Sequence, residues 1–192
     1  MKKKALITLL FALLVSIILP VTLKPEATSK TSKPKASYLM NPSKTYIYKD
    51  NFNTVYTYKY AKKFGWKGNQ GWNLWNVSES ENGKVTNKYT AISKETKNGL
   101  YSGLSKSNWL VDLKYPIKKG RTWTRVESDN EFDYTITSVN ATVKTPSGTY
   151  KNVIKLHSSD SEYTYYFAKG IGLIKETYEQ QYVLELQSIR NK

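Results

Sequence analysis

Two hairpin patterns follow each other closely between residues 143 and 175, and they restrict this chain to a fold built from antiparallel strands. In the first, residues 145–148 read Thr-Pro-Ser-Gly between two strand-like runs, and this combination favours a tight turn because proline fixes φ and glycine accepts a positive φ. In the second, the Lys169-Gly170 pair separates an aromatic run from an aliphatic one. Gly172 then indicates a β-bulge or a close backbone approach.

The strand after the first turn has the alternation of a half-buried strand. Tyr150, Ile154 and Leu156 share one parity, with Asn152 as a polar exception. Val153 falls on the opposite parity, together with lysines. Successive side chains of a strand point to opposite faces. The pattern therefore predicts a core-facing side and a basic, solvated side.

The rest of the chain is also typical of β structure. Sixteen Tyr, five Trp and five Phe suit a pleated, half-buried surface, and helical periodicity is nearly absent. We predict strands separated by turn residues, a short helical turn near residues 105–108, and an all-β fold with one antiparallel curved sheet forming a half-barrel or a barrel-like structure. The expected strands are 45–49, 54–60, 72–78, 84–92, 109–113, 122–127, 133–144, 149–158, 163–168, 171–176 and 181–188.

The two hairpins also carry a resemblance. The strand TPSGTYKNV followed by YYFAKGIGLIK resembles a domain that recurs in secreted proteins and lipoproteins of Gram-positive bacteria. Such domains are similar in outline to the curved antiparallel half-barrels of lipoprotein-carrier proteins. The resemblance covers residues 112–189, including the upstream YPIKKGRTW, and it brings no catalytic residues with it. The chain has no cysteine and so departs from the lipoprotein members, because it cannot be anchored through a lipobox.

The first residues have the pattern of a secretory signal. Three lysines precede an uncharged run from residue 5 to residue 19, which ends at Pro20. We predict a signal peptide over residues 1–29, cleaved after Ser29, and a secreted, extracellular protein. The alternative is an uncleaved membrane anchor, for which residues 5–23 are barely long enough to cross a bilayer.

The remaining chain divides into a spacer and one domain. Residues 30–44 are rich in Thr, Ser, Lys and Pro, a composition that predicts a flexible spacer. Residues 45–192 are long enough for a single antiparallel β domain, which we expect to be monomeric. Without disulfides, its hydrophobic core must stabilise it alone.

The charge of the chain points to anionic partners. The formal net charge is +15, and three of the 30 basic residues are arginines. Outside a cell, such a charge favours wall polymers, anionic glycans or lipid headgroups. Scattered lysines produce a diffuse positive electrostatic field, whereas bidentate binding of phosphate groups is typical of arginine. We therefore expect no specific nucleic-acid partner.

The segment from Phe64 to Trp75 is the best candidate for a binding site. Its glycines leave the backbone open, and tryptophans alternate with Asn, Gln and Lys. Aromatic faces beside amide groups suit a sugar ring or an amphipathic ligand. The candidate ligand-binding residues are Trp66, Lys67, Trp72 and Trp75. The competing interpretation is a bent hairpin in which Trp72 and Leu74 share a parity and fill the core.

Catalytic residue types are few. His157 is the only histidine, and the lysines expected on its strand face disfavour metal binding. The acidic segment 127–133 resembles a calcium loop weakly, since it lacks the EF-hand glycine and distal glutamate, and an acidic turn is the preferred interpretation. No serine-hydrolase, zinc-protease or phosphate-loop motif occurs. We predict no catalytic residue, no metal and no cofactor.

The function predicted from the sequence is a secreted, non-enzymatic β domain that binds an extracellular or cell-envelope ligand, whether anionic polymer, glycan or lipid. A carrier variant of this hypothesis requires a lined cavity of roughly several hundred Å³. The alternative is a small secreted hydrolase or nuclease that uses His157 or the carboxylates of Glu127, Asp129 or Glu131.

Overall fold

The computed structural model of this chain describes residues 37–127, 130–159 and 161–192. These residues form twelve strands and no helix, in one antiparallel sheet that is nearly closed into a barrel. The all-β, curved antiparallel prediction is therefore confirmed. The predicted signal peptide, residues 1–29, and the first part of the predicted spacer, residues 30–36, lie outside the described residues.

The strands follow the predicted order along the chain, and most are longer than predicted. Their bounds are β1 (Lys44–Asp50), β2 (Val55–Trp66), β3 (Asn69–Glu81), β4 (Lys84–Thr96), β5 (Gly99–Gly103), β6 (Trp109–Lys114), β7 (Thr122–Glu127), β8 (Asn130–Thr145), β9 (Gly148–Ser158), β10 (Tyr163–Ala168), β11 (Gly172–Tyr178) and β12 (Gln181–Asn191).

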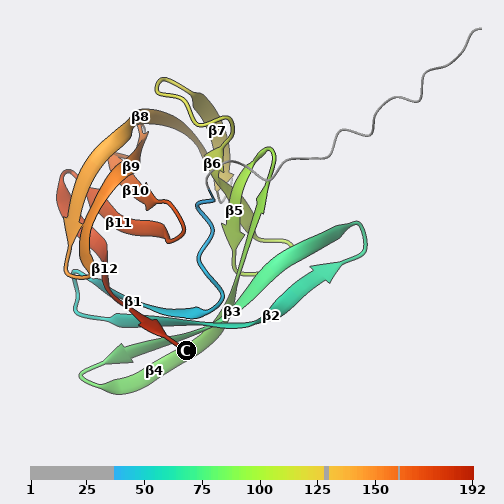
Figure 1. Cartoon of the computed structure of the whole chain (residues 1–192), viewed down its shortest axis with the longest axis vertical. Coiled ribbons are helices and arrows are strands. Elements are labelled where there is room, and N and C mark those ends of the chain that lie inside the picture. Colours follow the sequence, from blue (N-terminus) through green and yellow to red (C-terminus); the bar gives the residue numbers. More distant parts are fainter. Residues whose placement is uncertain (1–36, 128–129, 160) are drawn as a thin grey trace, which may run out of the picture. The chain divides into compact units, whose positions relative to one another are not determined.

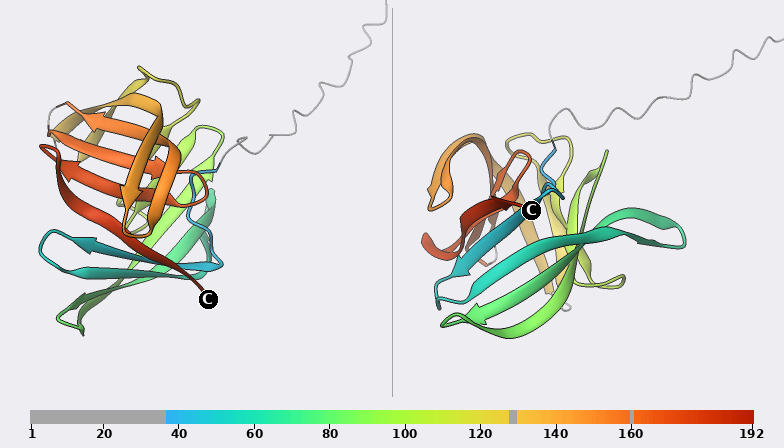
Figure 2. Two further views of the ribbon diagram at one scale, coloured as in Figure 1. Left: turned by 60° about the vertical axis from the view of Figure 1, so that its left-hand side comes forward. Right: turned by 60° about the horizontal axis from the view of Figure 1, so that its bottom comes forward.

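The sheet consists of two meanders joined through the first and last strands. Its order is β6-β5-β4-β3-β2-β1-β12-β11-β10-β9-β8-β7, so β6 and β7 are its two edges. Figures 1 and 2 show how the strands from β7 to β12 curve around one side of the interior, while β1 to β6 form the other side. The sheet bends until its two edge strands approach each other, but within the described residues β6 and β7 are not paired as neighbouring strands.

The predicted turns lie where the residue types require them. Thr145 pairs with Gly148 to close the β8–β9 hairpin, and Gly170 has a φ of +70° in the β10–β11 turn. The short helical turn predicted near residues 105–108 is found only as a bend with one turn-type hydrogen bond, and no helix forms there. These residues form a bend between β5 and β6, in which the Asn108 amide donates to the Ser105 carbonyl oxygen over 3.4 Å.

Two core clusters fill the concave side of the sheet. The first contains Tyr38, Leu100, Leu113, Trp123, Tyr134, Ile136, Ile154, Leu156 and Phe167. The second contains Tyr46, Tyr48, Trp75, Val143, Val153, Ala168, Ile174 and Leu186. Both clusters are rich in aromatic residues, because a strongly curved sheet leaves a wide interior that only large side chains can fill.

The alternation predicted for β9 is wrong at one residue. Val153 is fully buried in the second cluster, although the pattern assigns it to the solvated face. Asn152 has a φ of +55°, and the register of β8 with β9 shifts nearby. A bulge of this kind interrupts the alternation locally, so the neighbours Val153 and Ile154 are both buried while Asn152 is exposed. Ile154 and Leu156 keep the predicted core-facing parity.

Residues 37–43 run across the inside of the curved sheet, and we call them the interior strap (Figure 1). Tyr38 is buried in the first core cluster, and its amide donates to Glu95 Oε1 over 2.9 Å. The Ser37 carbonyl oxygen accepts a hydrogen bond of 2.7 Å from the Gly170 amide. The domain therefore extends back to Ser37, and the prediction of a spacer up to residue 44 is corrected for residues 37–44.

Gly172 explains how the interior strap can lie so close to β11. Its φ is +89°, and a Cβ at this position would lie 3.2 Å from the Tyr38 carbonyl oxygen. The sequence predicts a bulge or a close backbone approach here, and the structure contains both, because the register of β10 with β11 shifts between Tyr166 and Phe167.

Candidate functional site

An aromatic cluster lies where the end of the β2–β3 hairpin meets β5 and β6. Trp66 stacks on Trp72, with ring centroids 5.6 Å apart and planes inclined by 20°. Phe64 lies beside Trp66 at 5.9 Å. On the other side, Trp109 contacts Trp72 at 5.8 Å, and Tyr101 meets Trp109 edge-on at 5.7 Å. Five rings from four strands therefore form one continuous group.

Two lysines lie over these rings. Lys94 Nζ lies 5.7 Å from the centroid of the Trp72 ring and donates to Asn69 Oδ1 over 3.0 Å. The same Asn69 oxygen accepts a hydrogen bond from Trp72 Nε1 over 2.9 Å. Lys106 Nζ lies 5.7 Å from the Phe64 centroid. We call Phe64, Trp66, Lys94, Tyr101, Lys106 and Trp109, with Trp72 beneath them, the aromatic–lysine surface.

The members of this surface differ in exposure. Trp72 is only 1% exposed, so it supports the other rings and has little area left for a ligand. Trp66 is half-buried and Trp109 is 38% exposed. Lys67 lies exposed in the turn between β2 and β3. Among the sequence-predicted site residues, Trp66 and Lys67 are therefore accessible.

Trp75 is not part of this surface. It belongs to the second core cluster on the concave face, is 0% exposed, and donates from Nε1 to Ser93 Oγ over 2.9 Å. The prediction that Trp75 contacts a ligand is wrong, because its ring is enclosed. The competing interpretation, in which Trp72 and Leu74 fill the core, holds for Trp72, which is buried, whereas Leu74 is only half-buried. Alternation places both side chains on the face opposite Trp75.

Several members of the surface are absent from the sequence prediction. Tyr101, Lys106 and Trp109 come from the β5–β6 hairpin, and Lys94 comes from β4. Their position beside Trp72 depends on the register of β3 with β4 and of β4 with β5. The sequence signal available was the local pattern of aromatic and basic residues from 101 to 109.

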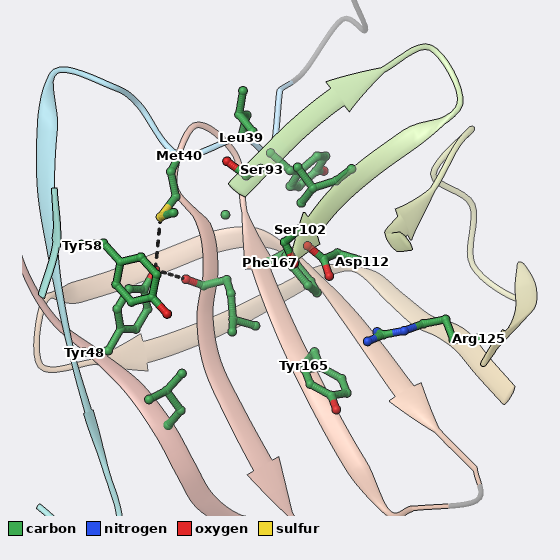
Figure 3. Close-up of a pocket in the computed structure, with 15 residues that line it drawn as sticks. Leu39, Met40, Tyr48, Tyr58, Ser93, Ser102, Asp112, Arg125, Tyr165 and Phe167 are labelled. Atoms are coloured by element: carbon green, nitrogen blue, oxygen red, sulfur yellow. Dashed lines mark hydrogen bonds between the residues drawn. The ribbon is translucent and has the colours of Figure 1, made fainter. Parts of the chain in front are cut away.

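A second candidate site is a cavity of about 190 Å³ inside the curved sheet, which we call the interior cavity (Figure 3). The interior strap forms one wall, and strands of both meanders form the others. Most of the lining is apolar, with a few polar side chains. The lining includes Tyr38, Leu39, Met40, Tyr48, Tyr58, Ser93, Leu100, Ser102, Asp112, Arg125, Tyr165, Phe167, Leu173 and Leu184.

Tyrosines of this cavity are held in the neutral state. Burial raises the pKa of Tyr48 well above its usual value, and the Tyr48 hydroxyl donates to the Leu173 carbonyl oxygen over 2.8 Å. Burial also raises the pKa of Tyr58, with nearby Tyr89 as a smaller cause. For Tyr165, burial raises the pKa first and the carboxylate of Glu176 second. The cavity therefore offers neutral hydroxyl groups rather than phenolates at physiological pH.

His157 lies in an open polar groove on the outer face of β8 to β11. The groove is lined by Lys155, Lys175 and several threonines, and by Glu162 and Glu179. The ring Nδ1 lies 3.2 Å from Thr164 Oγ1. Arginine is absent from the described lining of this groove, although the nuclease alternative requires one beside a carboxylate.

The acidic segment 127–133 lies at the β7–β8 hairpin. Asp133 Oδ1 accepts a hydrogen bond from Thr124 Oγ1 over 2.7 Å, while residues 128–129 and the side chain of Glu127 are outside the description. Within the described ranges, no group of three or more His, Asp or Glu side chains could hold a metal ion.

The described ranges also contain no helix long and apolar enough to cross a membrane. The predicted hydrophobic run at residues 5–19 is not among them.

Fold and site together define a curved, nearly closed antiparallel β domain with an aromatic–lysine surface outside and a small cavity inside. No protein-family model, curated protein or solved structure matches the chain. The resemblance to secreted Gram-positive domains therefore stays a prediction.

Proposed function

We propose that this protein is a secreted, non-enzymatic domain that binds an anionic glycan or wall polymer at the aromatic–lysine surface. The observation that carries the proposal is the stack of Trp66 on the buried Trp72, with Trp109 alongside and two lysines over the rings.

The ring geometry suits a saccharide. A sugar ring has an apolar face that packs on an aromatic ring and hydroxyl groups that need polar neighbours. Trp66 is fixed from below by Trp72, which is itself held by its hydrogen bond to Asn69. A ring that is already ordered loses little conformational entropy when a ligand binds.

The charge of the surface suits an anionic polymer. Lys94 and Lys106 lie at the rings, and Lys67 is exposed in the adjacent turn. The whole chain is strongly basic. Such a field raises the local concentration of polyanions, and its effect weakens as salt screens it.

The test is binding of the purified protein to isolated wall material, with and without its phosphate-containing polymer, at low and high salt. We expect saturable binding at low salt and weaker binding at high salt. Trp66→Ala and Trp109→Ala should each raise Kd about tenfold or more, as truncation of a central aromatic contact does. Lys106→Ala should weaken binding mainly at low salt.

Matched controls come from elsewhere on the domain. Phe52 is 82% exposed in the turn between β1 and β2, and Lys144 is exposed on β8. Phe52→Ala and Lys144→Ala should bind as the unchanged protein does. Equal losses in these controls, or failure of the unchanged protein to bind any wall fraction at either salt concentration, would contradict the proposal.

The enzyme alternative would act in the groove around His157, where Glu162 and Glu179 line the same surface. It predicts that the protein releases soluble fragments from wall polymer or RNA, and that His157→Ala abolishes the release. The binding proposal predicts no release and normal wall binding by His157→Ala.

A further inference from the structure

We propose that the interior cavity is a second binding site, which takes a neutral molecule about the size of one substituted aromatic ring. This inference is independent of the proposed function, because the cavity lies on the concave face and shares no residue with the aromatic–lysine surface.

The volume sets the size of the ligand. The cavity measures about 190 Å³. An apolar cavity of roughly 150 Å³ in another protein binds benzene, whereas pockets for drug-sized ligands have volumes of roughly 300 Å³ or more. The volume of the interior cavity lies between these two values, so it suits one ring with a small substituent. A long acyl chain with a headgroup does not.

The walls of the cavity are firmly built. Leu100 and Phe167 are each 4% exposed and belong to the first core cluster. The interior strap is fixed against β11, where Gly172 leaves room for the Tyr38 carbonyl oxygen. Figure 3 shows the Tyr165 and Phe167 side chains on neighbouring parts of one wall. Aromatic walls favour a ring-shaped ligand through edge-to-face and stacked contacts.

The charges of the lining favour a neutral ligand. Asp112 and Arg125 line the cavity from β6 and β7, one negative and one positive. Because one charge is negative and the other positive, the lining has no net charge. It therefore does not offset the desolvation cost of a charged ligand that moves from water into an apolar site. An uncharged ring avoids that desolvation cost.

Two hydroxyl groups can hold one polar substituent of the ligand. Ser93 and Ser102 both line the cavity. Ser93 Oγ already accepts from Trp75 Nε1 over 2.9 Å, so its own hydroxyl hydrogen remains to be donated. A phenol oxygen could accept this hydrogen, and an indole N–H could donate to Ser102.

The experiment measures binding of indole and p-cresol to the full chain by calorimetry and ligand-detected NMR, with benzoate and benzylamine as charged rings of similar size. Ser102→Phe fills the cavity with a benzyl group. Thr57→Phe adds the same group on the outer face of β2, since Thr57 alternates with the core-packed Tyr56 and Tyr58. Ser102→Ala keeps the space and removes one hydroxyl.

We expect saturable one-to-one binding of the neutral rings to the unchanged protein, to Thr57→Phe and to Trp66→Ala. Kd should rise at least about tenfold in Ser102→Phe and much less in Ser102→Ala. Intermolecular NOEs from the bound ring to Phe167 and Leu173 should locate the ligand in the unchanged protein, so the test does not depend on the folding of Ser102→Phe.

Three results would overturn the proposal. The first is no saturable binding of either neutral ring to the unchanged protein. The second is binding with NOEs to residues outside the cavity, or undiminished binding by a folded Ser102→Phe. The third is tighter binding of benzoate or benzylamine than of indole and p-cresol.

Discussion

Trp75 and Ser93 are joined by a hydrogen bond of 2.9 Å between Nε1 and Oγ, in the interior of the sheet, where the two side chains are 0% and 6% exposed. Trp72, three residues before Trp75, lies on the other face and supports Trp66. Two tryptophans of one strand thus have different roles, one in the core and one beneath a candidate binding surface.

The first prediction separates these two roles. Trp75→Ala should lower the free energy of unfolding by about 3–5 kcal/mol, because it removes a large buried ring and leaves a cavity. Trp66→Ala should lower the free energy of unfolding by much less, since Trp66 is only half-buried. Urea unfolding followed by circular dichroism measures both. A loss for Trp66→Ala as large as that for Trp75→Ala would contradict the structure.

A second prediction concerns the hydroxyl of Ser93. Ser93→Ala should destabilise the protein by about 1–3 kcal/mol, because it leaves the buried Trp75 N–H without its acceptor. Ser78→Ala, on the outer face of β3, should change stability by less than about 0.5 kcal/mol. Thermal unfolding of both variants checks the difference, and equal effects would count against the hydrogen bond.

A third prediction compares two glycines. Gly170 and Gly172 both have positive φ values, +70° and +89°, but only a Cβ on Gly172 would meet the interior strap. Either change to alanine should cost about 1 kcal/mol or more through backbone strain. Gly172→Ala should cost more, because the Tyr38 carbonyl must also shift. If Gly170→Ala is the more destabilising in urea unfolding, the strap does not lie on β11.

A fourth prediction concerns alkaline pH. Burial, together with the hydrogen bond from its hydroxyl to Asp50, raises the pKa of Tyr56 from 10.0 to about 12. The folded state holds the Tyr56 proton more tightly than the unfolded state does. The contribution of the protonated hydroxyl to folding stability is therefore complete below pH 10 and is lost as the pH rises through 12. Tyr56→Phe should therefore make stability fall less steeply over this range in pH-dependent urea unfolding. If the free energy of unfolding falls with pH as steeply in Tyr56→Phe as in the unchanged protein, Tyr56 does not have the raised pKa.

Most of the fold was predictable because its signals are local. Turn residues such as Asn82-Gly83 and Lys169-Gly170 mark the ends of strands, and aromatic alternation marks their length. β5 was not predicted, because glycine stands at both of its ends and glycine is typical of turns. Ala61 and Asn152 lie at register shifts, where alternation fails.

The candidate site was predictable only in part. Alternation places Trp72 and Trp75 on opposite faces but does not say which face is buried. Asn73 is on the same strand face as Trp75, and a polar residue there suggests that this face is exposed to solvent. In the structure Asn73 is 0% exposed, and its Oδ1 accepts a hydrogen bond of 2.7 Å from Lys63 Nζ. Trp109 and Lys106 reach the site through strand pairings that span several hairpins, and no local pattern encodes that.

The interior strap could not be found from composition. Residues 37–43 lack alternation, and their apolar residues Tyr38, Leu39 and Met40 form a run of only three after a polar, lysine-rich stretch. Their position depends on the curvature of the sheet, because the curved sheet has an inner surface on which this segment packs.

The pairing of β1 with β12 governs the order in which this domain can be completed. Every other strand pair is a hairpin of neighbours along the chain, whereas this pair joins residues such as Lys44 and Asn191. The strand that comes latest in this sheet along the chain must pair with the strand that comes first. Two separate meanders can form early from residues that are close in sequence. Joining them requires the eleven residues of β12 and carries the entropic cost of closing the longest loop between paired strands in the described sheet.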